Sequence, residues 1–140
     1  MRVDNWASKL ELIIEETKNK EKFVFGKNDC VTFVINSIEA ITGKKVFDNK
    51  YKTIKDAKEI IKSLKSKDLL DIALKIAKEN NFKVIDIDKA QKGDILYYTD
   101  NRSELNGTVG VCVGEKIMFN WKNEIALISK NNCKIAWRIE

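Results

Sequence analysis

The chain has 140 residues, 44% hydrophobic and 34% charged, which is the composition of an ordinary globular protein and predicts one domain. It contains no run of 18 apolar residues, so we expect no membrane span. Residues 1–6 do not show the charged and apolar segments of a secretory signal, so we expect the protein to be made in a cytoplasm.

The net charge of +5 comes from lysines that are scattered along the chain rather than gathered in one block. Such a pattern is typical of a solvated surface. Weak attraction to DNA, to an anionic cell wall or to a membrane stays open. Arginines and interleaved aromatic residues are too few to predict a nucleic-acid-binding stripe.

The chain has three cysteines, Cys30, Cys112 and Cys133, and no histidine. The cysteine spacings match no zinc signature, and three is an odd number, so we expect free thiols in a reducing compartment. Neither a metal site nor a cofactor is expected. Cys112 and Cys133 are expected to be buried as small apolar side chains.

Apolar residues recur at helical spacing over about residues 4–80. Asp4 can cap a first helix. A second, from about Asp29 to Thr42, is apolar on most sides and is therefore predicted to be the buried central helix, ended by Gly43 as a left-handed cap.

Two amphipathic helices are predicted to follow. Thr53 with Asp56 forms a possible capping box for one, and Ser66 or Asp68 begins the next. Because each has a single apolar face, we expect both helices to be packing units and not parts of a site.

From about residue 82 to residue 139 the apolar period changes to two, which predicts strands. Helices followed by an antiparallel meander indicate a single α+β domain covering residues 1–140. Asn106-Gly107 and Lys122-Asn123 are predicted turns. The expected strands cover residues 82–87, 95–98, 108–114, 116–121, 124–128 and 134–139.

Cys30 stands at the predicted start of the central helix, directly after the possible caps Asn28 and Asp29. In the first turn, free N–H groups and the helix dipole stabilise a thiolate. Cysteine proteases of the papain type place their nucleophile in this way. A nucleophile position in a chain without a histidine base is the central feature of this sequence.

Three short motifs in order resemble the NlpC-type cell-wall peptidases, a compact branch of the papain-like fold. They are Gly26-Lys27-Asn28-Asp29-Cys30, Gly93-Asp94-Ile95-Leu96, and Thr108-Val109-Gly110-Val111-Cys112-Val113-Gly114. With the closing Ala136-Trp137-Arg138, the chain is most similar to small uncharacterised phage and prophage proteins built on this core. The resemblance covers nearly the whole chain and implies a central helix packed on a C-terminal antiparallel sheet.

The resemblance also implies a site. In active members a histidine on the third motif takes the proton of the cysteine, and a third polar residue orients its ring. Cys30 occupies the nucleophile position and Thr108 the position of the missing histidine, while the third position falls near Phe119 or Asn120, of which only Asn120 is polar. Cys30 and Thr108 are therefore expected to face each other.

Asp29 and Asp94 are the possible replacement bases. A carboxylate beside the thiol would raise the pKa of the cysteine and oppose thiolate formation, so catalysis is in doubt.

Three functions follow as hypotheses. The first is a catalytically degenerate NlpC-like domain that binds other proteins as a structural or accessory component of a phage tail or related virion assembly, made in the host cytoplasm. The second is an active cysteine hydrolase that cuts peptidoglycan with an unconventional or partner-supplied base. The third is a basic accessory protein that binds nucleic acid.

Overall fold

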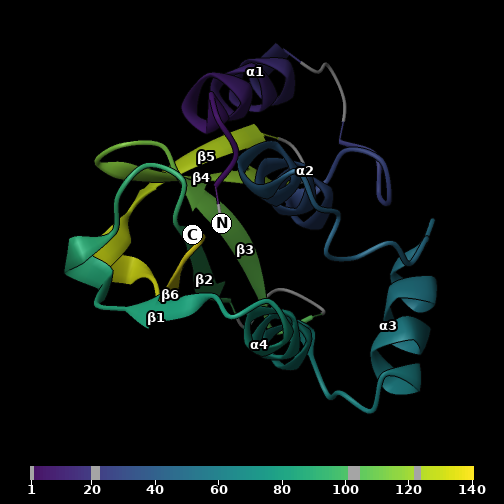
Figure 1. The fold of residues 1–140 in the computed structure, drawn as a ribbon. Coiled ribbons are helices and arrows are strands. Elements are labelled where there is room, and N and C mark those ends of the chain that lie inside the picture. Colours follow the sequence, from purple (N-terminus) through teal and green to yellow (C-terminus); the bar gives the residue numbers. More distant parts are fainter. Residues whose placement is uncertain (1, 20–22, 101–104, 122–123) are drawn as a thin grey trace.

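The structure is a computed structural model that describes residues 2–19, 23–100, 105–121 and 124–140. Within these ranges the chain is an α+β protein whose helices precede a six-stranded antiparallel sheet, as the change of period predicts (Figure 1). The helices are α1 Trp6–Asn19, α2 Cys30–Thr42, α3 Ile54–Ser63 and α4 Leu69–Glu79. The strands are β1 Lys83–Ile85, β2 Ile95–Thr99, β3 Gly107–Cys112, β4 Lys116–Trp121, β5 Glu124–Ser129 and β6 Ile135–Arg138.

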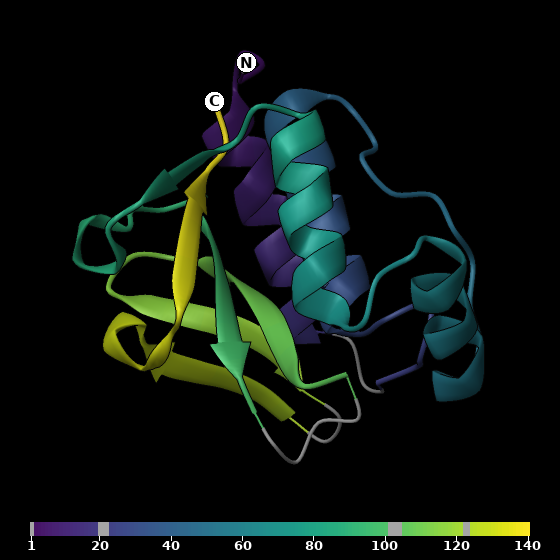
Figure 2. The ribbon, with the colours of Figure 1, turned by 90° about the horizontal axis from the view of Figure 1, so that it is seen from below.

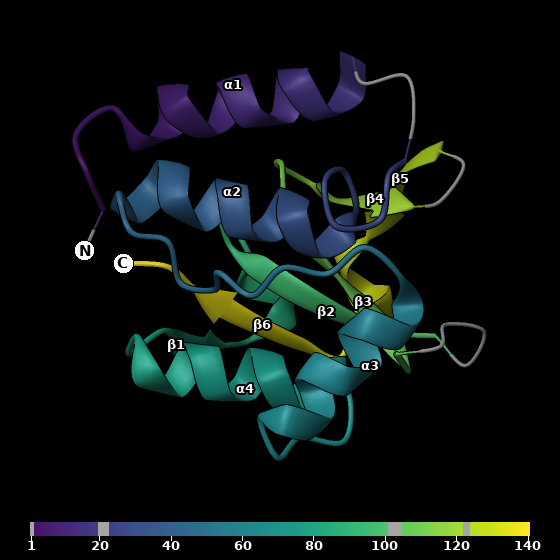
Figure 3. The ribbon, with the colours of Figure 1, turned by 90° about the vertical axis from the view of Figure 1, so that its right-hand side faces the viewer.

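Helix α2 occupies the centre of the helical side. It packs against β3 on one flank and against α1 on the other, so it lies between α1 and the sheet (Figure 3). Gly43 ends it with a φ of 74°, and its N–H donates to the carbonyl of Glu39 at 2.7 Å. The predicted buried helix and its glycine cap are both confirmed.

The strand order is β1-β6-β2-β3-β4-β5, with every pair antiparallel. Strands β2 to β5 follow one another as the predicted meander. The last strand is different, because β6 inserts between β1 and β2. The meander expectation is therefore wrong at this edge. Local alternation predicts strands but carries no information about which non-adjacent strand pairs with which.

Two clusters of buried apolar residues lie on the two faces of the sheet. The larger joins α1, α2 and α4 to Ile95, Val109, Val111 and Trp137. All four α-helices of the described chain lie on that side (Figure 2). The smaller cluster, on the opposite face, contains Leu96, Ile117 and Phe119 together with the thiols of Cys112 and Cys133, which are buried as expected.

The chain ends meet beside α2. Val3 donates its N–H to the carbonyl of Ile41 at 2.8 Å, and Arg2 Nε donates to the carbonyl of Ile139 at 2.8 Å. Residues near the two termini therefore lie side by side, as all three ribbon views show (Figures 1–3).

Several element ends differ from the predictions. Strand β1 is shorter than residues 82–87, and β3 begins at Gly107, which was expected in a turn. Thr53 caps α3, but the carboxylate of Asp56 accepts from the N–H of Lys52, so the predicted box is not reciprocal. The turn predicted at Lys122-Asn123 lies outside the described residues.

Among the residues described, no helix has the length and apolar character needed to cross a membrane.

Candidate functional site

The turn before Cys30 explains the spacing of the first motif. Val24 and Asn28 exchange backbone hydrogen bonds of 3.0 and 2.7 Å, which brings the chain back on itself. Gly26 inside this turn has a φ of 87°, and a Cβ there would lie 1.8 Å from the carbonyl oxygen of Tyr51. Only glycine fits this backbone position, for steric and conformational reasons.

Asp29 is the N-cap of α2 and is almost fully buried. Its Oδ1 accepts from the N–H of Thr32 at 2.8 Å, and its own N–H donates to Thr32 Oγ1 at 2.8 Å, which makes a reciprocal capping box. Its Oδ2 accepts from the N–H of Gly26 at 2.7 Å and from the hydroxyl of Tyr51 at 2.8 Å. The carboxylate is thus engaged by three donors and holds the turn to the helix, which does not suit a general base.

Cys30 is the first residue of α2, as predicted, but its thiol has a high pKa. Burial among apolar side chains raises that pKa to about 11, and the negative charge of Asp29 adds to the rise. The hydroxyl of Thr108 and the N–H groups of Val109 and Val31 act in the opposite direction. Desolvation therefore outweighs the stabilisation of a thiolate by the helix start.

Thr108 lies on β3 beside Cys30, so the structure brings these two predicted residues together. Its hydroxyl is close enough to lower the pKa of the thiol, yet it makes no hydrogen bond of regular geometry within the described residues. The side chain is 5% exposed. A buried hydroxyl without a regular partner is uncommon.

Asn120 on β4 is also buried, and it supports the turn and not the thiol. Its Nδ2 donates to Oδ1 of Asn28 at 2.7 Å and lies 3.4 Å from the carbonyl oxygen of Asp29. Both partners precede Cys30 in the chain. Asn120, at the predicted third polar position, therefore contacts Asn28 and Asp29 at the start of α2.

Asp94, the other possible base, belongs to a separate cluster. It is fully buried and accepts from Nε and Nη2 of Arg138 at 3.2 and 3.0 Å, and from the N–H of Gln91 at 2.8 Å. It precedes Ile95, which pairs with Val111, whereas Thr108 pairs with Tyr98 near the other end of β2. Asp94 thus lies four residues, or about 13 Å, along the sheet from Thr108.

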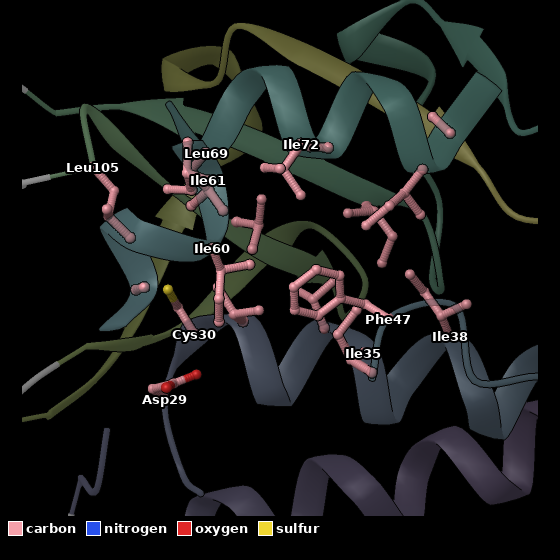
Figure 4. A pocket seen from close by; sticks show the side chains of 18 of the residues that line it. Asp29, Cys30, Ile35, Ile38, Phe47, Ile60, Ile61, Leu69, Ile72 and Leu105 are labelled. Carbon is pink, nitrogen blue, oxygen red and sulfur yellow. The ribbon is translucent and has the colours of Figure 1, made fainter. Parts of the chain in front are cut away.

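A cavity of about 100 Å³ opens beside Cys30 and extends between α2, α3, α4 and the sheet (Figure 4). Its walls are almost wholly apolar. Helices α3 and α4 contribute their apolar faces to these walls. The labelled side chains that surround it include Cys30, Ile35, Ile38, Phe47, Ile60, Ile61, Leu69, Ile72 and Leu105.

Two tyrosines near Cys30 were not predicted as site residues. Burial raises the pKa of Tyr51 above its ordinary value, as do the charge of Asp29 and the hydrogen bond to it. Burial likewise raises the pKa of Tyr97 to about 12, with smaller effects from Asp68 and Cys30. Tyr51 comes from a segment without regular structure, where no periodicity signals its position; Tyr97 is an ordinary strand residue in the sequence.

Comparison with known proteins identifies the family of this chain but assigns it no activity. A search of curated proteins finds no match. The family model described as a domain of unknown function, DUF6950, matches residues 1–139. Because that match spans all but the last residue, the chain belongs to the DUF6950 family.

Proposed function

We propose that this protein works by binding and not by turnover, as a catalytically degenerate NlpC-like domain within a phage tail or related virion assembly. The observation that carries the first half is the apolar environment of the Cys30 thiol at the start of α2, which raises its pKa. With a pKa of about 11, only about one thiol in ten thousand is ionised at pH 7. Nearby Thr108 supplies a hydroxyl, which is no base at neutral pH.

The NlpC-like assignment is supported by the order of the sequence motifs and by the placement of their residues. Cys30 begins the central helix and Thr108 lies beside it on the sheet, as the resemblance leads one to expect. The assembly part of the proposal rests on the likeness to small phage and prophage proteins. Its partners are then other virion proteins, and peptidoglycan is a possible contact.

The direct test is loss of turbidity of purified peptidoglycan on addition of the protein, with Cys30→Ala as the matched control. We expect no lysis by either protein. Lysis by the wild type that disappears in Cys30→Ala would contradict the proposal and favour the cysteine hydrolase. Mass spectrometry of purified particles from the source tests the assembly part, and absence of the chain from them would refute it.

The replacement Thr108→His restores the missing imidazole in the position next to the thiol. If the site is a dormant dyad, the pKa of Cys30 falls because an imidazolium stabilises the thiolate. We expect thiol labelling to reach its plateau at a lower pH than in the wild type. Unchanged labelling would count against the NlpC-like correspondence.

Steeply salt-dependent DNA binding by the wild-type protein would favour the nucleic-acid hypothesis instead.

A further inference from the structure

Strand β5 forms one outer edge of the sheet, and β1 forms the other (Figure 1). The N–H of Val113 donates to the carbonyl of Lys116 at 3.0 Å, so Lys116 directs its backbone groups toward β3. The bonding direction alternates along an antiparallel strand, so every second residue of β4 from Ile117 onward bonds to β5 instead. The partner of Ile117 is Ile128. Ile128 and every second residue before it therefore bond to β4.

The remaining residues of β5 form a row of free backbone groups. Ile125, Leu127 and Ser129 direct their N–H and C=O groups away from the sheet, and within the described chain these groups have no hydrogen-bond partner. The row is centred on Leu127, whose side chain is 54% exposed although its cross-strand neighbour Met118 is buried. The edge is thus accessible to another strand.

Strand β5 lacks the features that normally stop identical edge strands from pairing. Protected edges are short, are interrupted by a bulge, or carry lysine or proline. Strand β1 follows this rule, because it has three residues and includes Lys83. Strand β5 has six residues in unbroken register with β4, and residues 125–129 include no charge and no proline. Because such features act against self-pairing, their absence points to a second copy of the chain.

We propose that two copies of the protein dimerise by antiparallel pairing of their β5 strands, with a twofold axis at Leu127. An axis perpendicular to the sheet keeps the helix-covered faces of both copies on the same side. Leu127 then lies opposite Leu127 of the other copy, and Ile125 lies opposite Ser129. This register satisfies every free group of both strands, whereas a shift of two residues leaves a third of them unsatisfied.

Symmetry also explains why β5 pairs with β5 and not with β1 of another copy. Two β5 strands close the assembly at a dimer, whereas pairing of β5 with β1 would leave free edges and continue into a polymer. One strand from each copy is a small contact, so we expect reversible association that depends on protein concentration. No β5 residue lines the cavity beside Cys30, so the dimer is independent of the function proposed above.

Sedimentation velocity of the full chain between about 5 and 500 µM tests the dimer. Leu127→Lys places like charges opposite each other at the axis and should weaken association at least about tenfold. Val84→Lys makes the same change of charge at an exposed residue of β1 and should associate like the wild type. A monomer at every concentration, or equal effects of the two replacements, would overturn the proposal.

Disulfide formation locates the axis even if Leu127→Lys does not fold. Opposed residues of a hydrogen-bonded pair have Cα atoms about 5.5 Å apart, within the range of about 4.4–6.8 Å that a disulfide needs. Leu127→Cys should therefore give a covalent dimer on mild oxidation, with the two introduced thiols joined in peptide mass spectra. Val84→Cys should not, although Val84 is 64% exposed. No dimer from Leu127→Cys, or equal yields from both variants, would refute pairing at Leu127.

Amide hydrogen exchange of the wild type, followed by NMR at about 50 µM and 1 mM, tests the pairing without a substitution. Outward amides exchange from the monomer, so the exchange rates of Ile125, Leu127 and Ser129 should fall in proportion to the monomer fraction. The amides of Ala126 and Ile128 already bond to β4, and their rates should not change. Concentration-independent exchange at Leu127 would contradict the β5 interface.

Discussion

The pH dependence of Cys30 alkylation follows quantitatively from the structure. At pH 7 a thiol with a pKa of about 11 is about 300-fold less ionised than an ordinary cysteine with a pKa near 8.5. The more basic thiolate is intrinsically about 10- to 18-fold more nucleophilic, which offsets part of this difference. Cys30 should therefore react roughly 17- to 30-fold more slowly than a cysteine in an unstructured peptide, before any limit on access.

The assay is iodoacetamide labelling between pH 6 and pH 10.5, resolved by peptide mass spectrometry, with a model peptide in the same tube. Site resolution is necessary because burial also raises the pKa values of Cys112 and Cys133. The Cys30 rate should still rise about tenfold per pH unit at pH 10, where the peptide has levelled off. A plateau below pH 8, or a rate within threefold of the peptide at pH 7, would refute the reasoning.

Three further predictions concern the unfolding free energy, measured by urea denaturation. First, it should fall as pH rises from about 9 to 11, by up to about 3 kcal/mol for each of the thiols of Cys30 and Cys133, because their folded pKa values of about 11 exceed the unfolded ones. The stabilisation is complete below the unfolded pKa, and a flat profile over this window would contradict the pKa shifts. Second, Gly26→Ala should cost at least about 3 kcal/mol through steric overlap with the Tyr51 carbonyl, whereas Gly114→Ala, where φ is 144° and no heavy atom lies within 4 Å, should cost only the backbone strain of about 1–2 kcal/mol. Equal losses of unfolding free energy in the two variants would show that the chain relieves the steric overlap at residue 26 without an energetic cost. Third, Arg138→Met should cost about 3–5 kcal/mol because it leaves Asp94 buried without its partner, while Lys92→Met, which breaks the half-exposed pair with Glu11, should change stability by less than about 1 kcal/mol. Similar losses of stability in Arg138→Met and Lys92→Met would mean that the Asp94 carboxylate is hydrated in the Arg138→Met variant.

Local patterns in the sequence determined the helices, their caps and most strands. Asp29 as a cap, Gly43 as a left-handed end and the change of apolar period at residue 82 are all short-range signals. The motif around Gly26 also predicted where Cys30 would lie. Each of these features depends on a few neighbouring residues, so a single sequence is enough to predict it.

The tertiary structure alone decided the state of the thiol and the presence of a cavity. A helix start by itself favours a thiolate, but packing of α3 and α4 near Cys30 removes water and raises its pKa instead. The insertion of β6 between β1 and β2, which brings Trp137 into the cavity wall, likewise depends on pairing between distant segments. Desolvation and long-range pairing are properties of the assembled fold, so no local pattern around Cys30 could predict them.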